Sequence, residues 1–212
     1  MMKDPYLYPN HEALINLFNA TDETVLNSIE ADYTSLRIKE LLDNPIKGNF
    51  DLQHLCKIHK FIFQDIYEWA GKIRIINIEK AEEALSGLSI EYSDVFEIVK
   101  HSGSVLFKLN SICWNSINIT QKAILFAESM TDIWKIHPFR EGNTRTIIVF
   151  CCDFAERNGF PLNRDLFKDN SAYVRRALVA SSAFFKDMGD KRKPEFLTNF
   201  IHDAIIKRSH LQ

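Results

Sequence analysis

Two helix-forming runs of this chain are joined by nine residues, His137-Pro138-Phe139-Arg140-Glu141-Gly142-Asn143-Thr144-Arg145. Pro138 restricts the residue before it and lacks an N–H, so a helix over residues 120–135 has to end here. Gly142 supplies the permissive backbone angles that a tight turn needs. A second helix is expected from Asn143 to about Asn158. The stretch therefore predicts a helix–loop–helix unit at which two long helices of the fold meet.

Most of the remaining chain also shows the apolar spacing of amphipathic helices. Helices are predicted over residues 22–43, 52–67, 120–135, 143–158, 169–186 and 194–207. Asp51 and Thr120 are expected N-caps, and Gly159 is expected to end the fourth helix. The expected apolar stripe of the first helix is Val25, Ile29, Tyr33, Leu36 and Leu41-Leu42. These patterns predict a mainly all-α fold.

One segment does not follow the helical spacing. Residues Lys72-Ile73-Arg74-Ile75-Ile76-Asn77-Ile78 are rich in β-branched side chains and partly alternate, which is typical of a strand. Gly71 separates the segment from the preceding helix, and residues 81–92 are its expected hairpin partner. The predicted architecture is a helical bundle with one short β-hairpin.

The composition fits one globular domain over residues 1–212, with a core at about 50–200 and an N-terminal helical extension at about 10–45. The 212 residues are 46% hydrophobic, 25% charged and 12% aromatic, which excludes a disordered chain. The net charge of −2 gives no overall attraction to nucleic acid or to anionic membranes, so neither is an expected partner.

Several features favour a cytoplasmic protein. The start of the chain lacks the apolar region of a secretory signal, and no apolar run approaches the ~20 residues that span a bilayer. The cysteines do not follow a zinc-binding spacing, and reduced, mostly buried thiols are expected. These residues are Cys56, Cys113, Cys151 and Cys152.

The loop between the two helices combines a base, a carboxylate and a guanidinium. The free N–H groups at the start of the second helix form an anion site, to which Arg145 adds a positive fork. Glu141 would repel phosphates there unless a divalent cation such as Mg²⁺ lay between them. His137, with an ordinary pKa near ~6.5, can accept a hydroxyl proton at neutral pH. Together these residues predict a phosphoryl- or nucleotidyl-transfer site.

Taken one at a time, the same residues have simpler explanations. A histidine beside a proline is more often structural than catalytic. Glu141 would be a favourable charge near a helix N-terminus, Arg145 a solvated charge, and Phe139 a core residue. The functional interpretation therefore depends on the combination of all of them in one ordered string.

That string resembles the motif of the Fic family, His-x-Phe-x-Asp/Glu-Gly-Asn-Gly-Arg-x-x-Arg. The matching residues are His137, Phe139, Glu141, Gly142, Asn143 and Arg145. The start of the chain, Asp4-Pro5-Tyr6, and the stretch from Ile58-His59 to Arg74 are also similar to Fic proteins. The resemblance covers about residues 4–200.

The resemblance implies a Fic-like helical bundle that transfers AMP from ATP to a Ser, Thr or Tyr hydroxyl of a target protein. His137 would be the general base, and Glu141 would hold Mg²⁺ (or Mn²⁺) at the phosphates. The phosphates themselves would contact Gly142, Asn143, Thr144 and Arg145. A flap segment would align the target by adding it as a strand. This flap segment consists of Ile73, Arg74, Ile75, Ile76, Asn77 and Ile78, although for Arg74, as for His59, a scaffold role is the simpler explanation.

Two positions depart from the motif, because Thr144 replaces its second glycine and Ile148 its final arginine. Threonine is tolerated in a first helical turn, whereas the missing arginine pairs with the γ-phosphate in the family. Two alternatives therefore stay open: a non-catalytic scaffold that binds nucleotide or a partner protein, and a transferase with another nucleoside triphosphate as donor. The presence of both His137 and Glu141 favours the enzyme.

The N- and C-terminal helices also lack the motif Ser/Thr-x-x-x-Glu-Gly/Asn, which inhibits many Fic proteins. Because its glutamate captures the arginine that Ile148 replaces, such a helix would have no partner here. The resemblance instead allows a small antitoxin or other regulatory protein as a partner. It also allows delivery of the chain into the cytoplasm of a host cell.

Overall fold

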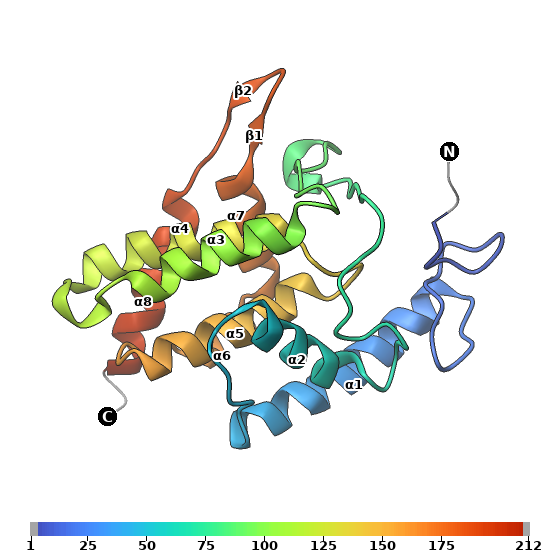
Figure 1. Ribbon diagram of the computed structural model, residues 1–212, viewed down its shortest axis with the longest axis horizontal. Helices are drawn as coiled ribbons and strands as arrows, with labels where there is room; N and C mark the ends of the chain where they lie inside the picture. The colour runs from blue at the N-terminus through green and yellow to red at the C-terminus, as the bar shows by residue number, and fades with distance from the viewer. Residues whose placement is uncertain (1–3, 210–212) are drawn as a thin grey trace.

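The computed structural model describes residues 4–209 and shows a bundle of helices (Figure 1). The helices are α1 (Glu23–Asp43), α2 (Leu52–Phe63), α3 (Ile98–Ser111), α4 (Ile119–Ile136), α5 (Asn143–Arg157), α6 (Arg164–Asp169), α7 (Ser171–Ser182) and α8 (Glu195–Ser209). Helix α4 packs against α3, α5, α7 and α8, while α2 lies between α5 and α1. The predicted mainly helical class is confirmed. Within residues 4–209, no helix is long and apolar enough to cross a membrane.

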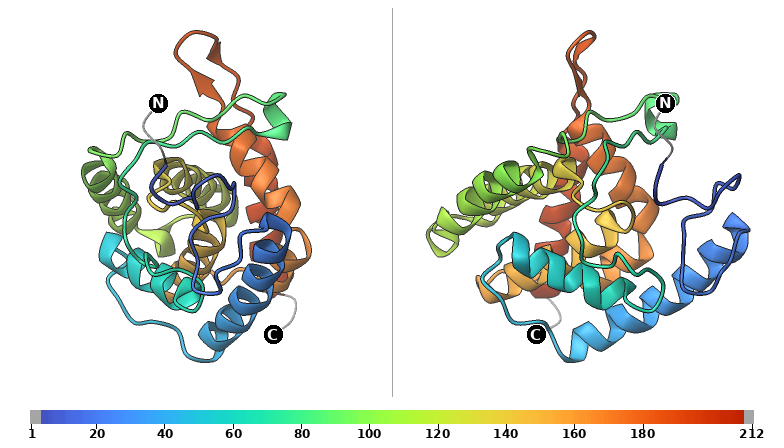
Figure 2. Two further views of the ribbon diagram at one scale, coloured as in Figure 1. Left: turned by 90° about the vertical axis from the view of Figure 1, so that its right-hand side faces the viewer. Right: turned by 45° about the vertical axis from the view of Figure 1, so that its right-hand side comes forward.

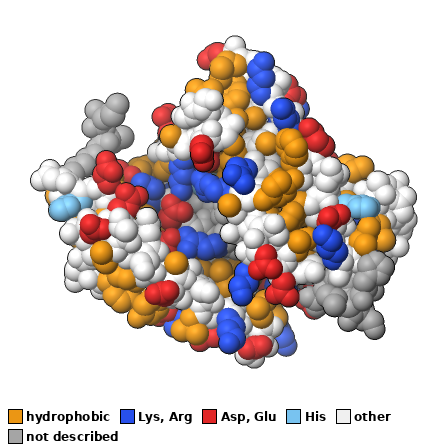
Figure 3. All heavy atoms as spheres, turned by 180° about the vertical axis from the view of Figure 1, so that it is seen from behind, with side chains coloured by type: hydrophobic (Ala, Val, Ile, Leu, Met, Phe, Trp, Pro, Cys, Tyr) orange, Lys and Arg blue, Asp and Glu red, His pale blue; other side chains and the backbone are white. Residues whose placement is uncertain are grey.

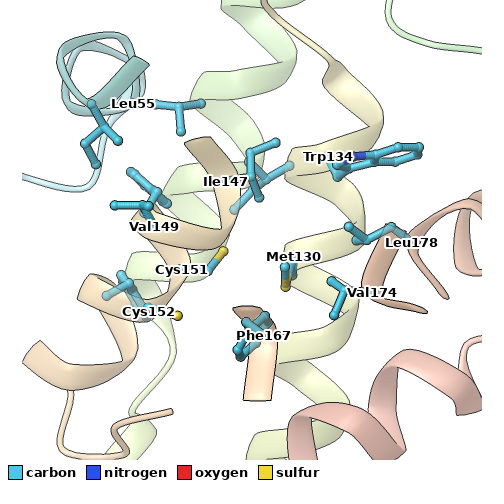
Figure 4. Close-up of a cluster of buried hydrophobic side chains, with 14 of the residues drawn as sticks. Leu55, Met130, Trp134, Ile147, Val149, Cys151, Cys152, Phe167, Val174 and Leu178 are labelled. Carbon is cyan, nitrogen blue, oxygen red and sulfur yellow. The ribbon is translucent and has the colours of Figure 1, made fainter. Parts of the chain in front are cut away.

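The core lies where α4, α5 and α7 meet (Figure 4). Met130 and Trp134 of α4, Ile147 of α5 and Leu178 of α7 are each 0% exposed. Burial of one such side chain contributes roughly 1.5–3 kcal/mol relative to its exposure to water. The loop between α4 and α5 is thus held at both ends by helices that are anchored in the core.

Polar side chains cap the N-termini of α1, α2, α4 and α6. Asp51 caps α2 as predicted, because its side chain accepts a hydrogen bond of 2.8 Å from the His54 N–H. Helix α4 is capped by Asn118 rather than by Thr120, since Asn118 and Gln121 form a reciprocal capping box. After α5, Gly159 adopts the expected left-handed backbone, with φ of +76°.

Three helices differ from the prediction. The expected helix over residues 169–186 is α7, which spans only Ser171–Ser182 because Phe184 and Phe185 belong to β1, and the short α6 before it was not predicted. Helix α3 was not predicted at all. Its middle holds Ser102, Gly103 and Ser104, which are weak helix formers, and packing against α4 compensates for them.

The predicted strand over residues 72–78 is wrong. The chain bends at Ile75 and Ile76, and residues 72–78 belong to none of the strands in the part of the chain that the structure describes. The small antiparallel sheet is instead a hairpin of β1 (Phe184–Phe185) and β2 (Gly189–Asp190). The β-branched residues favour the extended backbone, but the expected partner contains a 3₁₀ turn at Glu83–Leu85 and offers no ladder.

The amides of the flap segment bond to the body of the protein instead. The Arg74 N–H donates to the Pro138 carbonyl at 2.9 Å, and the Ile75 N–H donates to the Tyr6 hydroxyl at 3.2 Å. The flap segment is therefore fastened at its base both to the α4–α5 loop and to the N-terminal segment.

Helix α1 turns a different face inward from the predicted apolar stripe. Val25 and Leu36 of that stripe are 51% and 55% exposed. The buried residues of α1 are Leu26, Glu30, Thr34 and Leu41. Glu30 and Thr34 bond to Arg145 of α5, so the inward face has to be partly polar, and the spacing of apolar residues indicates the wrong side.

Candidate active site

His137 is the first residue after α4 and lies at the inner wall of the loop. It adopts a left-handed backbone with φ of +51°, which is uncommon for residues other than glycine. The Arg74 guanidinium donates to the His137 carbonyl at 2.9 Å and helps to hold this conformation. Such conformations persist where the surroundings enforce them, and they concentrate at functional sites.

The imidazole of His137 has one satisfied and one free nitrogen. Nδ1 lies 3.3 Å from the Trp134 carbonyl, which can only accept, so Nδ1 carries the proton. Nε2 is buried and has no hydrogen-bond partner among the described residues. The Tyr92 ring lies over the imidazole at 4.1 Å. The Trp134 ring lies edge-on at 5.3 Å, so Nε2 is enclosed and keeps an unused lone pair.

The pKa of His137 lies well below its ordinary value. Burial is the main cause, and the Lys80 ammonium lowers the pKa further by repelling a second positive charge. Glu141 opposes this effect but does not outweigh it. His137 is thus a neutral imidazole at physiological pH, which is the state a general base requires.

Glu141 is ion-paired. Its Oε2 lies 2.6 Å from Nζ of Lys80, and its Oε1 accepts the Gly142 N–H at 2.9 Å. Burial alone would raise the pKa of Glu141, but Lys80 and the Gly142 N–H outweigh it and bring the pKa to about 2. The carboxylate of Glu141 is therefore ionised and half-buried, and the Lys80 ammonium is in contact with it.

Gly142 allows the turn and the close packing beneath it. Its φ is +78°, and a Cβ at this position would lie 2.1 Å from the Phe63 ring. Directly after it, the backbone N–H groups of Asn143, Thr144 and Arg145 form the first turn of α5, where a helix provides no acceptors for them. These donors and the positive end of the helix dipole lie where the sequence predicts an anion site.

The side chains of Asn143 and Thr144 brace the loop. Asn143 is 2% exposed, and its amide donates to the Phe139 carbonyl at 2.8 Å and accepts the Phe139 N–H at 2.9 Å. The Thr144 hydroxyl accepts from the Trp134 indole at 2.9 Å. Thr144 occupies the position of the motif's second glycine, and its side chain gains a hydrogen bond to Trp134 of α4.

Arg145 and Ile148 lie one turn apart on α5. Arg145 pairs with Glu30, donates to the Thr34 hydroxyl at 3.1 Å and lies over the Phe63 ring at 4.9 Å. Its side chain is still 32% exposed. Ile148 is half-buried and packs against the core, so this position contributes an apolar side chain where the motif has a charge.

The flap segment divides into a buried anchor and exposed side chains. Arg74 is 2% exposed and donates to the carbonyls of Ile76 and Ser93 as well as to that of His137. Ile75 is 69% exposed. Ile73, Ile76 and Ile78 are half-buried, and Asn77 is exposed and bonds to Asp94 at 2.8 Å.

His59 lies in the core behind the loop and links it to the flap segment. Its ring is stacked between Phe63 and Phe139, at 4.6 and 3.8 Å. Its Nδ1 accepts the Gly71 N–H at 2.8 Å, so Nε2 carries the proton that is donated to the Glu141 carbonyl at 3.0 Å. The scaffold role is the one that the structure shows.

Lys80, Tyr92 and Glu30 complete the site and were not predicted from the sequence. Lys80 follows the flap segment by two residues, and a lysine in a charged stretch carries no distinctive signal. Glu30 precedes Arg145 by 115 positions in the chain. The only available signal was its place in a helix, four residues before Thr34, on the face opposite the apolar stripe.

A metal at this site would have one protein carboxylate. Among residues 4–209, no group of three or more His, Cys, Asp or Glu side chains is arranged to hold a metal ion. Glu141 beside the anion site fits a Mg²⁺ ion, which is commonly held by one or two carboxylates together with substrate phosphates. The Lys80 ammonium at 2.6 Å shows that this carboxylate accommodates a cation at contact distance.

Positive charge is gathered locally despite the net charge of −2. Figure 3 shows a face of the molecule that is hollowed near its centre, with Lys and Arg side chains around the hollow. Local cations of this kind can attract a polyphosphate without a basic protein as a whole.

Comparison with known proteins places this geometry in a family. Residues 49–155 match the sequence model of the Fic/DOC family. Over 76% of the chain, the sequence is 32% identical to protein adenylyltransferase VbhT of Bartonella schoenbuchensis and 31% identical to the probable protein adenylyltransferase y4lH of Sinorhizobium fredii. The matched region spans about a third of VbhT (33%) but 80% of y4lH.

Solved structures show the same fold. The N-terminal Fic domain of a VirB-translocated effector from Bartonella sp. AR 15-3 superposes with a TM-score of 0.79 at 19% identity, over 98% of this chain and 93% of that one. BepC of Bartonella tribocorum, solved with bound AMPPNP, gives a TM-score of 0.76 at 19% identity, over 94% and 95% of the two chains.

Proposed function

Because this chain belongs to the Fic/DOC family, we propose that it transfers AMP from ATP to a Ser, Thr or Tyr hydroxyl of a target protein. The observation that carries the proposal is the unpartnered Nε2 of a neutral, buried His137 beside an anion-binding helix N-terminus. Neither a structural histidine nor a plain nucleotide-binding loop requires both features together.

In the proposed reaction, Nε2 of His137 takes the proton of the target hydroxyl. The hydroxyl oxygen forms a bond to the α-phosphorus of ATP, and the bond from that phosphorus to the bridging oxygen of the β-phosphate breaks. Pyrophosphate leaves with the bonding electrons. The Trp134 carbonyl stabilises the protonated imidazole through Nδ1, since it accepts that hydrogen throughout.

We propose that Glu141 holds a Mg²⁺ (or Mn²⁺) ion that is shared with the phosphates. When bound, this ion supplies positive charge that neutralises the phosphate oxygens as negative charge moves toward pyrophosphate. Lys80, which now contacts the carboxylate at 2.6 Å, would have to release it to admit the ion.

The phosphates would be bound chiefly by backbone and by Arg145. The first-turn N–H groups after Gly142, those of Asn143 and Thr144 among them, would contact the α-phosphate, and the free N–H groups of Arg145 would contact the departing phosphates. The Asn143 side chain supports this arrangement by fixing Phe139, and therefore the loop, in place.

The flap segment would present the target. The exposed side chain of Ile75 would contact an extended peptide, and strand addition would use backbone groups beyond Ile75, because the amides of Arg74 and Ile75 already bond to the body of the protein. The buried Arg74 holds the segment to the His137 carbonyl. Neighbours of this fold are described as VirB-translocated effectors. We accordingly propose a protein target in a cytoplasm, that of the producing cell or of a host, and a separate antitoxin-like regulator.

A second candidate is a scaffold that binds nucleotide without transfer. The half-buried Ile148 favours it, because this side chain offers no charge to a γ-phosphate. It also leaves the donor open to nucleoside triphosphates other than ATP.

Intact-protein mass spectrometry distinguishes the two candidates. The purified chain is incubated with Mg²⁺ and each of ATP, GTP, UTP and CTP, alone and with a cell lysate, beside a His137→Ala control. The transferase predicts a gain of one nucleoside monophosphate, on the chain itself or on a lysate protein, in the wild type only. Nucleotide binding without any such gain would support the scaffold and contradict the transferase.

A further inference from the structure

Glu30 is a buried carboxylate with two strong partners. It lies on α1, before residues 49–155 that match the family, and its side chain is 9% exposed. Oε2 accepts the Tyr67 hydroxyl at 2.5 Å, and Oε1 accepts from Arg145. Burial and the neighbouring Glu30 charge raise the pKa of Tyr67, so this phenol remains a donor. Both oxygens of Glu30 are therefore fixed in direction.

The guanidinium of Arg145 is held on three sides. One terminal nitrogen donates to Glu30 and the other to Thr34 at 3.1 Å, and the Phe63 ring supports the plane from below at 4.9 Å. Only part of its hydrogen-bonding capacity is used, because an arginine has five N–H donors. The side chain is 32% exposed, so it is accessible to a ligand.

A purely structural link between α1 and the core would not favour this arrangement. Taking a carboxylate out of water costs several kcal/mol, and an apolar pair of similar volume commonly stabilises a fold at least as well. Helix α1 carries apolar residues, but Val25 and Leu36 are left exposed while Glu30 is buried. The buried position of the Glu30 carboxylate is therefore explained by its contact with Arg145 rather than by helix packing.

We propose that Glu30 is a positioning residue that orients Arg145 for the phosphates of the nucleotide. This inference rests on the proposed function, in which Arg145 contacts the departing phosphates. It assigns part of the nucleotide site to α1, outside the matched family region. Preorganisation of this kind strengthens binding because the guanidinium loses less freedom when the phosphates arrive.

Nucleotide binding in a double-mutant cycle tests the proposal. Affinity for AMPPNP with Mg²⁺ is measured by titration calorimetry for wild type, Glu30→Gln, Arg145→Ala and the double variant. In the wild-type background, we expect Glu30→Gln to weaken AMPPNP binding about tenfold, as for loss of a charged hydrogen bond. In the Arg145→Ala background, the same substitution should change the affinity less than about twofold. Thr34→Val should weaken binding in the same sense by a smaller factor.

Matched controls separate this effect from general damage. Glu40 lies on the same helix and pairs with Arg37 at the surface. Glu40→Gln removes its charge and should leave the affinity for AMPPNP unchanged. Thermal unfolding confirms that each variant is folded, and Thr34→Val carries the test should Glu30→Gln fail to fold. Unchanged or tighter binding by Glu30→Gln, or an equal loss with and without Arg145, would overturn the proposal.

The readout also separates this inference from the proposed reaction. Binding of AMPPNP does not depend on transfer, so a chain that transfers nothing can still show the coupling between Glu30 and Arg145. A wild type that transfers AMP but shows no coupling would overturn the positioning role alone. A wild type that does not bind AMPPNP would contradict both.

Discussion

Gly142 is subject to two separate constraints, and a substitution can tell them apart. Alanine would have to adopt φ near +78° and would place its Cβ 2.1 Å from Phe63, so we expect the free energy of unfolding to fall by about 2–4 kcal/mol. Gly87→Ala is the matched control, because Gly87 has φ of +90° with open space around it and should cost only about 1 kcal/mol. Equal losses in urea unfolding would show that the contact with Phe63 is unimportant.

Burial of His59 makes stability depend on pH. Burial, with a smaller effect of Arg145, lowers its pKa to about 3, whereas the unfolded chain has a pKa near ~6.5. The unfolded state therefore binds more protons, and stability that is fully present above ~6.5 is lost as the pH falls toward ~3. From this residue alone we expect a loss of about 2 kcal/mol by pH ~5.

Urea unfolding at several pH values between ~5 and ~7.5 measures this loss. His59→Gln should show a shallower dependence on pH than the wild type, since glutamine does not titrate. His101→Gln replaces an exposed histidine, with 46% of its side chain accessible, and should retain the wild-type slope. A slope in His59→Gln as steep as that of the wild type would contradict the assignment.

At this scale, a local string carries much of the site but not all of it. His137, Glu141, Gly142 and Arg145 were predicted because one loop and one helix turn bring them together. Their partners come from distant parts of the chain, such as Lys80 at 61 positions from Glu141. Such contacts are decided by packing of the helices, and no spacing in the sequence encodes them.

Among the structural elements, the flap segment depends on one side chain. Arg74 donates to the carbonyls of His137, Ile76 and Ser93, and in Arg74→Met these buried acceptors would lose their donor. We expect stability to fall by about 2–4 kcal/mol and the flap segment to become accessible to protease. Limited proteolysis with mapping of the first cleavage site checks this. The control variant is Arg192→Met, which removes an exposed ion pair. First cleavage elsewhere would contradict the anchoring role.

The elements also show which local signals are reliable. Caps and breakers acted as expected at Asp51 and Gly159, because they satisfy helix ends wherever the helix lies. The strand over residues 72–78 and the inward face of α1 were wrong, because both depend on what lies opposite. A strand needs a partner ladder, and the buried face of a helix needs a complementary surface.

In the whole molecule, the N-terminal segment and α1 lie against the elements that carry the site. Figure 2 shows both along one side of the bundle, and α1 packs on α2. Asp4 pairs with Arg140 of the loop at 2.8 Å, and Tyr6 accepts the Ile75 N–H of the flap segment. Asp4 and Tyr6 thus contact the α4–α5 loop and the flap segment, and the extension expected from the sequence at about 10–45 contacts Arg145 through Glu30.

Removal of this region should unfold the protein. Residues 4–44 bury apolar side chains to 9% exposure or less, namely Tyr6, Ala13, Leu14, Leu26 and Leu41. At roughly 1–3 kcal/mol each, their loss amounts to about 5–15 kcal/mol, which is comparable with the whole stability of a typical domain. A fragment that begins at residue 45 should therefore lack the single cooperative thermal transition expected of the full chain, and it should bind a hydrophobic dye. The same fragment mixed with residues 1–44 should regain part of the transition if the two pieces associate through these contacts. A fragment that unfolds cooperatively at the temperature of the full chain would show instead that α1 is an independent appendage, and the contacts of Glu30 and Asp4 would then be dispensable for the fold.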